Sequence, residues 1–401
     1  MLRFGVWHDG QMRHVTDDER RARLAVRHAL APDFRVESPE VAARAMTVLH
    51  ATEPSTVHLA CWARVRTFAV ADLDRAMYTD RNLVKQLAMR RTLFVFPRDL
   101  LSAAWGSASA RVAGTEAARM AKDIVAAGIA ADGSAWVAAA RAAVLTVLAA
   151  APDGLTAAEV RQAVPLIDVT VPVAGSVGEA WSAPRVLTLL GATADIVRGQ
   201  ATAGFPTVRT RWTLTQNWLD EVPVAGTSAD GYREIIRRWL YSFGPGTEAD
   251  LVWWLGATRT VVRRALAELG AVRVSLNVGG DDGWLLPDDL DVVPDPGPWV
   301  ALLPVLDPTV MGWQGRDFYL GPHRDRLFDS RGNAATTAWV NGRVVGCWVH
   351  DAAGAVRVRL LEPVTADAQR ALDAEARRLT DWLGGIRIVT GYTSPAMRAP
   401  L

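Results

Sequence analysis

The sequence is poor in cysteine, lysine and net charge. Its 401 residues include two cysteines, Cys61 and Cys347, too few for a disulfide framework or a cysteine-rich zinc site. The formal net charge is +1, so any surface that binds phosphate has to be a local patch. Lys85 and Lys122 are the only lysines, and arginine supplies the remaining positive charge. Because arginine suits bidentate recognition of phosphate and guanine, this bias permits DNA binding without demonstrating it.

Long apolar runs and metal-ligand motifs are also missing. The Ala-rich stretch 135–151 falls short of the ~20 residues of a membrane span, and no apolar secretory core follows the N-terminus, so we expect a cytoplasmic protein. The seven histidines form no His-x-x-x-His pair, and we expect neither a metal nor a cofactor. The lack of G-x-S-x-G, phosphate-loop and dinucleotide-binding motifs leaves the corresponding hydrolases, kinases and dehydrogenases without support.

The chain is long enough for several hydrophobic cores, and its first part reads as helices followed by a strand. Helical spacing of apolar residues covers 17–30, and Ser38 with Pro39 predicts the start of a second helix over 38–49. A further helix is predicted over 71–78 and a strand over 87–96. This order is typical of a winged-helix unit, which we assign to residues 15–125.

The same order of elements recurs twice. In residues 130–222, a long helix that ends at 150 precedes helices over 157–163 and 183–190 and a strand pair between 196 and 214. Residues 228–292 repeat it, with helices over 232–243, 248–255 and 260–269 and strands 272–274 and 284–286 that flank a glycine-rich turn at 279–283. A winged helix reads DNA grooves, although a single copy can also serve as a dimerisation or protein-docking module.

The last part, residues 296–401, is rich in strand patterns. Strands are predicted over 300–306, 335–340, 343–350 and 357–361, followed by a helix over 366–383. The sequence therefore predicts an α+β protein with three tandem winged-helix units and a small C-terminal β-barrel-like domain.

Several segments together resemble the AlkZ-like DNA glycosylases. They are LHATEP at 49–54, HLACWARV at 58–65, LAMRRTLFV at 87–95, GPGTEADLVWWLG at 244–256, LLPVLD at 302–307 and VNGRVVGCW at 340–348. The resemblance implies a C-shaped scaffold that clasps duplex DNA containing bulky alkylated purines, which some relatives also release from interstrand cross-links formed by genotoxins. It also implies a monofunctional glycosylase, here expected as a monomer, that hydrolyses the N-glycosidic bond and leaves an abasic site.

The sequence departs from these relatives at the motif that carries their chemistry. They have Gln-apolar-Gln or Gln-apolar-Asp where this chain has His50-Ala51-Thr52. N7-alkylation places positive charge on the purine, so the base leaves without a general acid, and polar side chains need only position water and stabilise the sugar cation. His50 and Thr52 are therefore the catalytic candidates, with neighbouring Glu53 as a base or electrostatic stabiliser. Alternatively, His50 packs at a helix end, Thr52 forms a local turn, and catalysis is lost.

Five arginines are candidates for DNA contact. Arg64, Arg90 and Arg91 flank the catalytic candidates, whereas Arg209 and Arg211 alternate along a presumed wing strand and would share one face. For each of them a salt-bridged surface role is the competing interpretation. The tryptophans are expected mostly in the core, and among them we place Trp253 and Trp254 in an apolar helix.

Three functions remain open from the sequence. The first is a DNA glycosylase for alkylated purines. The second is a non-catalytic DNA-binding or regulatory protein that kept the scaffold and lost the chemistry. The third is a protein-interaction scaffold that never meets DNA, which the small net charge permits.

Overall fold

The structure is a computed structural model that describes residues 12–172, 179–276 and 282–399. The described helices are α1 Asp17–Arg27, α2 Pro39–Ala45, α3 Pro54–Arg64, α4 Val70–Asp74, α5 Leu101–Ala104, α6 Ala110–Ala126, α7 Gly133–Ala149, α8 Ala157–Ala163, α9 Ser182–Ala192, α10 Thr215–Trp218, α11 Ser228–Phe243, α12 Glu248–Leu255, α13 Arg259–Glu268, α14 Pro308–Met311, α15 Asp317–Leu320, α16 Arg324–Leu327, α17 Ala366–Leu383 and α18 Pro395–Arg398. The described strands are β1 His14–Val15, β2 Leu49–His50, β3 Leu83–Ala88, β4 Thr92–Pro97, β5 Thr170–Pro172, β6 Glu179–Trp181, β7 Ile196–Ala203, β8 Arg209–Leu214, β9 Gly246–Thr247, β10 Val272–Leu276, β11 Asp282–Leu285, β12 Val300–Leu303, β13 Thr337–Val340, β14 Arg343–His350 and β15 Val356–Leu360.

Local capping explains where several helices begin. The Ser38 hydroxyl accepts a hydrogen bond from the Val41 amide at the start of α2. Thr247 and Asp250 form a reciprocal capping box at the start of α12. This helix ends at Leu255, and the left-handed backbone of Gly256 after it (φ 62°) lets the chain turn toward α13. The sequence signals at these positions predicted the starts of the helices correctly.

The sheets are small and open. The order β2-β4-β3 forms a three-stranded sheet, and β12-β13-β14-β15 forms the C-terminal sheet. In the described residues the edge strands β12 and β15 do not pair with each other, so the expected β-barrel-like domain is not confirmed, and α17 packs against these two strands. One pairing was not predicted at all: the two residues of β1, near the N-terminus, pair in parallel with β10.

Two local predictions are corrected near the candidate site. The helix expected over 38–49 ends at Ala45, and the chain then enters strand β2. The strand expected over 87–96 is a hairpin, in which β3 and β4 are joined by a turn over Met89–Arg91. Arg90 and Arg91 adopt positive φ angles there (53° and 60°), a conformation usually left to glycine or asparagine. The sequence therefore carries no turn signal at this position.

The hairpins expected in the second and third units are present. Strands β7 and β8 pair antiparallel, as do β10 and β11. Most of the glycine-rich turn predicted at 279–283 lies outside the described residues. The proposed unit boundaries and the winged-helix arrangement of the three units remain predictions.

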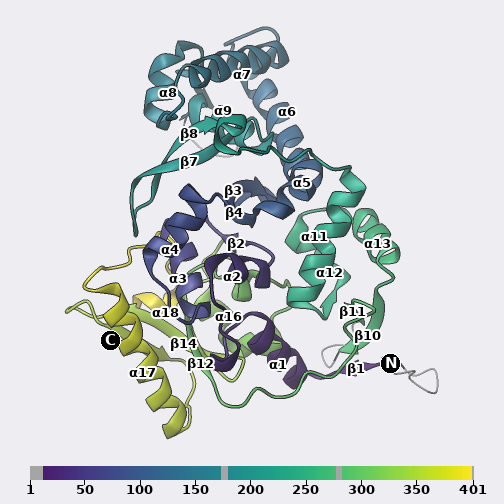
Figure 1. Ribbon diagram of the computed structural model, residues 1–401, viewed down its shortest axis with the longest axis vertical. Helices are drawn as coiled ribbons and strands as arrows, with labels where there is room; N and C mark the ends of the chain where they lie inside the picture. Colours follow the sequence, from purple (N-terminus) through teal and green to yellow (C-terminus); the bar gives the residue numbers. More distant parts are fainter. Residues whose placement is uncertain (1–11, 173–178, 277–281, 400–401) are drawn as a thin grey trace.

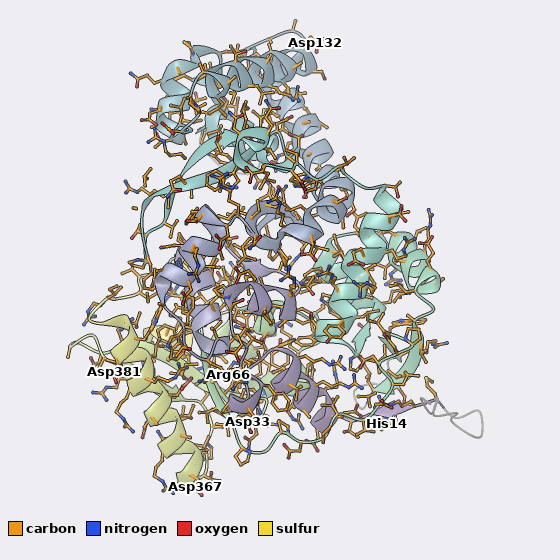
Figure 2. The ribbon with its side chains drawn as sticks, in the orientation of Figure 1. His14, Asp33, Arg66, Asp132, Asp367 and Asp381 are labelled. Carbon is orange, nitrogen blue, oxygen red and sulfur yellow. The ribbon has the colours of Figure 1, made fainter. Side chains whose placement is uncertain are left out.

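The molecule has an upper lobe above a broader body (Figure 1). Helices α6 to α9 form the lobe, and the β7–β8 hairpin descends from it toward α4 (Figure 1). One hydrophobic core occupies the lobe, and a larger one joins the N-terminal, third-unit and C-terminal segments. Asp132 marks the outer end of the lobe, and Asp367 the outer end of α17 (Figure 2). Within the residues that the structure describes, no helix is long and apolar enough to cross a membrane.

Candidate active site and DNA interface

The three catalytic candidates lie in the turn between β2 and α3. His50 ends β2, where it pairs with Phe94 of β4, and Leu49 before it is fully buried. Glu53 is the residue before Pro54, which begins α3 because its fixed φ suits the first helical position. Strand β2 and helix α3 therefore fix the ends of a four-residue turn, residues 50–53.

His50 is buried and neutral. Its ring meets Phe94 edge to face at a centroid distance of 5.4 Å, and its Nδ1 accepts a hydrogen bond from the Thr52 amide at 3.4 Å. Burial, with a smaller contribution from the charge of Arg90, lowers the pKa of His50 to about 3. With Nδ1 accepting, the proton of the neutral ring resides on Nε2. The cavity of about 10 Å³ that His50 lines with Arg90, Phe94 and Trp254 is near the lower limit for one water molecule.

Thr52 and Glu53 have different surroundings from His50. Thr52 is exposed, whereas Glu53 is half-buried. The Thr390 hydroxyl donates to Glu53 Oε2 at 3.2 Å, which ties the C-terminal segment to the turn. Burial raises the pKa of Glu53, and the hydrogen bonds from Thr390 and the Gly391 backbone oppose that shift. The turn thus combines a neutral imidazole, an accessible hydroxyl and a carboxylate that is partly withdrawn from water.

Arg64 does not reach the surface. Its guanidinium is fully buried and forms a bidentate pair with Asp307, at 2.7 and 2.9 Å, and a hydrogen bond to Thr309. The pair joins the C-terminal end of α3 to the start of α14. We therefore correct the sequence interpretation: Arg64 is a structural residue and offers nothing to DNA.

Arg90 and Arg91 are neighbours with opposite environments. Arg91 is exposed and pairs with Glu116 of α6 at 2.9 Å. Arg90 is half-buried, with its guanidinium carbon 3.9 Å from the centre of the Trp253 ring. In the described part of the chain, the Arg90 side chain has no hydrogen bond and no ion pair. It lines the small cavity beside His50 and so belongs to the candidate site.

Arg209 and Arg211, the two arginines expected on a wing strand, lie on β8. Arg209 is exposed, whereas Arg211 is half-buried, donates to the Gly154 carbonyl at 2.9 Å and lies 3.4 Å from Glu159. Both stand on the hairpin that descends from the upper lobe (Figure 1). Arg209 is the more accessible of the two.

Sequence reasoning missed several residues near the turn. Trp254 is buried as expected, but Trp253 is only half-buried and carries Arg90 on its ring. Arg316 lies over the same ring at 4.8 Å, and Thr390 bonds Glu53 from more than 300 positions away. No local signal marks Arg316 or Thr390, because only the tertiary fold brings them here. In the described residues, no group of histidine, cysteine, aspartate and glutamate is arranged to hold a metal ion.

Comparisons with known proteins decide the family. The family described as DNA glycosylase AlkZ-like matches residues 43–382, a range that contains the 50–53 turn and all five candidate arginines. The chain belongs to this family. Among solved structures, the DNA glycosylase AlkZ of Streptomyces sahachiroi is similar to this AlkZ-like chain, with a TM-score of 0.71 and 19% identity over 92% of this chain and 97% of the other. At that identity the likeness concerns the fold. No curated protein matches the sequence.

Proposed function

We propose that this AlkZ-like protein is a monofunctional DNA glycosylase that acts as a monomer on N7-alkylated purines in duplex DNA. The observation that carries the proposal is the 50–53 turn: within the segment that matches the family, a half-buried carboxylate, an exposed hydroxyl and a neutral histidine follow one another. Purines in interstrand cross-links are N7-alkylated as well and form a second substrate class of the same chemistry.

The proposed reaction needs no general acid for the leaving base. An N7-alkylpurine carries a positive charge, so cleavage of its bond to C1′ returns the electron pair to the ring and releases a neutral base. Water adds to C1′ of the sugar cation and loses a proton. The Glu53 carboxylate suits both requirements, since its negative charge stabilises the cation and it can accept that proton. Thr52 and the Nε2–H of His50 supply hydrogen bonds that orient the water.

We infer that duplex DNA is held by helix–turn–helix and hairpin elements of the three proposed winged-helix units. Arg90, Arg91, Arg209 and Arg211 are the proposed contacts, and neutralising several of them should weaken binding and flatten its salt dependence. Phosphate contacts of this kind position a protein on the duplex and leave sequence unread.

One experiment tests the proposal. The protein is incubated with a duplex oligonucleotide that contains a single N7-methylguanine, and the products are analysed for free base and, after alkaline treatment, for strand cleavage at that position. We expect release of N7-methylguanine together with an alkali-labile site, and an intact strand before the alkali step. Strand cleavage without alkali would contradict a monofunctional enzyme.

The second candidate is a DNA-binding protein without catalysis. His50 and Thr52 stand where relatives have a glutamine-containing pair, and the cavity beside His50 is small. This alternative predicts binding of the same oligonucleotide with no release of the base over hours, whereas the proposed enzyme releases it under single-turnover conditions.

A further inference from the structure

Two arginines without carboxylate partners lie over one tryptophan beside His50. The guanidinium carbons of Arg90 and Arg316 are 3.9 and 4.8 Å from the centre of the Trp253 ring. Arg316 is also 4.8 Å from the centre of the Phe328 ring. Within the described residues neither arginine forms an ion pair, whereas the four buried arginines other than Arg316 (Arg13, Arg20, Arg23 and Arg64) each have one.

The energetic cost of burying these two charges is only partly offset by contacts within the chain. Arg316 is 5% exposed, and its Nε and Nη2 have no hydrogen-bond partner; the same holds for Nε of Arg90. Burial, and then the charge of Arg316, lower the pKa of Arg90 to about 10. Contacts with aromatic faces offset part of the cost of burying a cation, but they do not neutralise it. An anion at this position would satisfy the free donors and remove the repulsion between the two cations.

We propose that Arg90 and Arg316 form a binding site for one backbone phosphate of DNA, next to the 50–53 turn. Arg90 is the contact residue, because its half-buried guanidinium has terminal nitrogens without partners. Arg316 is a positioning residue, which packs on the same ring and adds positive charge behind it. This inference rests on the proposed function, since it places the phosphate of the strand that carries the damaged nucleotide.

The positive charge of the two arginines indicates which part of the DNA binds at this site. A cationic N7-alkylpurine would be repelled by two arginines, so the base itself does not belong here. A phosphodiester matches the fork of donors that a guanidinium offers, and charge-assisted hydrogen bonds of this kind are strong.

The test measures binding of undamaged duplex DNA by fluorescence anisotropy over a series of KCl concentrations. Arg90→Met should weaken binding about ten-fold at moderate salt and make the slope of log K against log[KCl] shallower by about 0.9, the amount expected for one lost phosphate contact. The matched control is Arg370→Met on α17, an exposed arginine that pairs with Asp367 at the outer end of the molecule (Figure 2). It should leave both quantities unchanged. A wild-type slope in Arg90→Met would overturn the proposal.

For Arg316, the unfolding temperature and the DNA affinity are measured on the same variant. A positioning role changes the affinity, whereas a purely structural role changes the unfolding temperature. Arg316→Met keeps an unbranched side chain against both rings and removes a buried charge without a carboxylate partner, so its unfolding temperature should not fall while its DNA affinity decreases about three-fold or more. A lower unfolding temperature with wild-type affinity would show a purely structural role and contradict our assignment. If Arg316→Met does not fold, Arg316→Lys replaces it: this variant keeps the charge and should retain the wild-type salt slope, and a shallower slope would count against the assignment.

Failure of this inference can be distinguished from failure of the proposed function. The binding assay uses undamaged DNA and needs no turnover. Wild-type protein that excises N7-methylguanine while Arg90→Met keeps the wild-type salt slope would reject the phosphate site alone. A shallower slope in Arg90→Met with no excision by the wild type would support the phosphate site and reject the glycosylase.

Discussion

Two arginine sites in this molecule differ in how the positive charge is compensated. Arg64 meets Asp307 in a bidentate pair, and its two terminal nitrogens also donate to Thr309 and to the Ala60 carbonyl. Arg90 and Arg316 share an aromatic ring and have no carboxylate partner in the described residues. The charge of Arg64 is neutralised within the chain, whereas the charges of Arg90 and Arg316 have no carboxylate partner among the described residues.

This difference distinguishes an arginine that stabilises the fold from an arginine that is available to bind an anion. Sequence patterns assigned Arg64 and Arg90 to the same surface, because both flank the same motif. Burying a charge is expensive unless a partner neutralises it, so an arginine that remains uncompensated marks a place where an anion is expected.

The largest effect is expected at the compensated pair. Arg64→Met leaves the fully buried Asp307 carboxylate without its partner, which should lower the free energy of unfolding by about 3–5 kcal/mol. Chemical denaturation followed by circular dichroism measures this loss. The double variant Arg64→Met/Asp307→Leu removes both charges and should recover part of it. Single-variant losses below about 1 kcal/mol would show that the pair contributes no more than an exposed ion pair.

The next effect concerns His50 and acid. Its pKa in the folded protein is about 3, against an ordinary value of 6.5. Below pH 6.5 the unfolded chain therefore takes up a proton that the folded protein does not bind, and stability falls as the pH decreases toward 3. Between pH 6 and 4, His50 should contribute up to about 1.4 kcal/mol per pH unit to this fall. His50→Gln should remove that contribution, as denaturation curves at several pH values would reveal. Parallel curves for the two proteins would contradict the neutral, buried state.

The smallest effect should come from Arg91, next to Arg90 in the chain. Arg91 has to leave Glu116 before it can reach a phosphate, so Arg91→Met should weaken DNA binding by at most about three-fold, less than Arg90→Met does. The two variants are compared in the same anisotropy titration with undamaged duplex. A larger loss of DNA affinity in Arg91→Met than in Arg90→Met would contradict the inference that the arginine without a carboxylate partner is the stronger phosphate contact.

Much of the fold was predictable because its helices carry strong local signals. Ser38, Thr247 and Thr258 cap their helices as expected, and the helix from Ala366 to Leu383 was predicted over its full length. The open C-terminal sheet was not predictable, since strand patterns specify an exposed and a buried face but not closure of the edges.

The sequence located the chain segment that forms the candidate site, but it did not predict which other residues surround that segment. The family motif located residues 50–53, but the turn at Arg90 and Arg91 contains neither glycine nor asparagine and was interpreted as strand. The partners of the site, Arg316 and Thr390, come from distant parts of the chain. The burial of Arg64 depends on Asp307, which lies 243 positions away.

The most direct test of the account is the effect of Glu53→Gln on single-turnover excision of N7-methylguanine, with excess protein and a duplex that is fully bound. Glutamine keeps the size of the side chain and can still accept from Thr390, but it loses the charge and the basic oxygen. We predict an excision rate at least ~10²-fold below that of the wild type, with DNA affinity unchanged. In the wild type, the rate should fall as the pH decreases through the raised pKa of Glu53. Equal rates for the two proteins would contradict a catalytic role for Glu53, and tight binding without excision by the wild type would contradict the proposed enzyme.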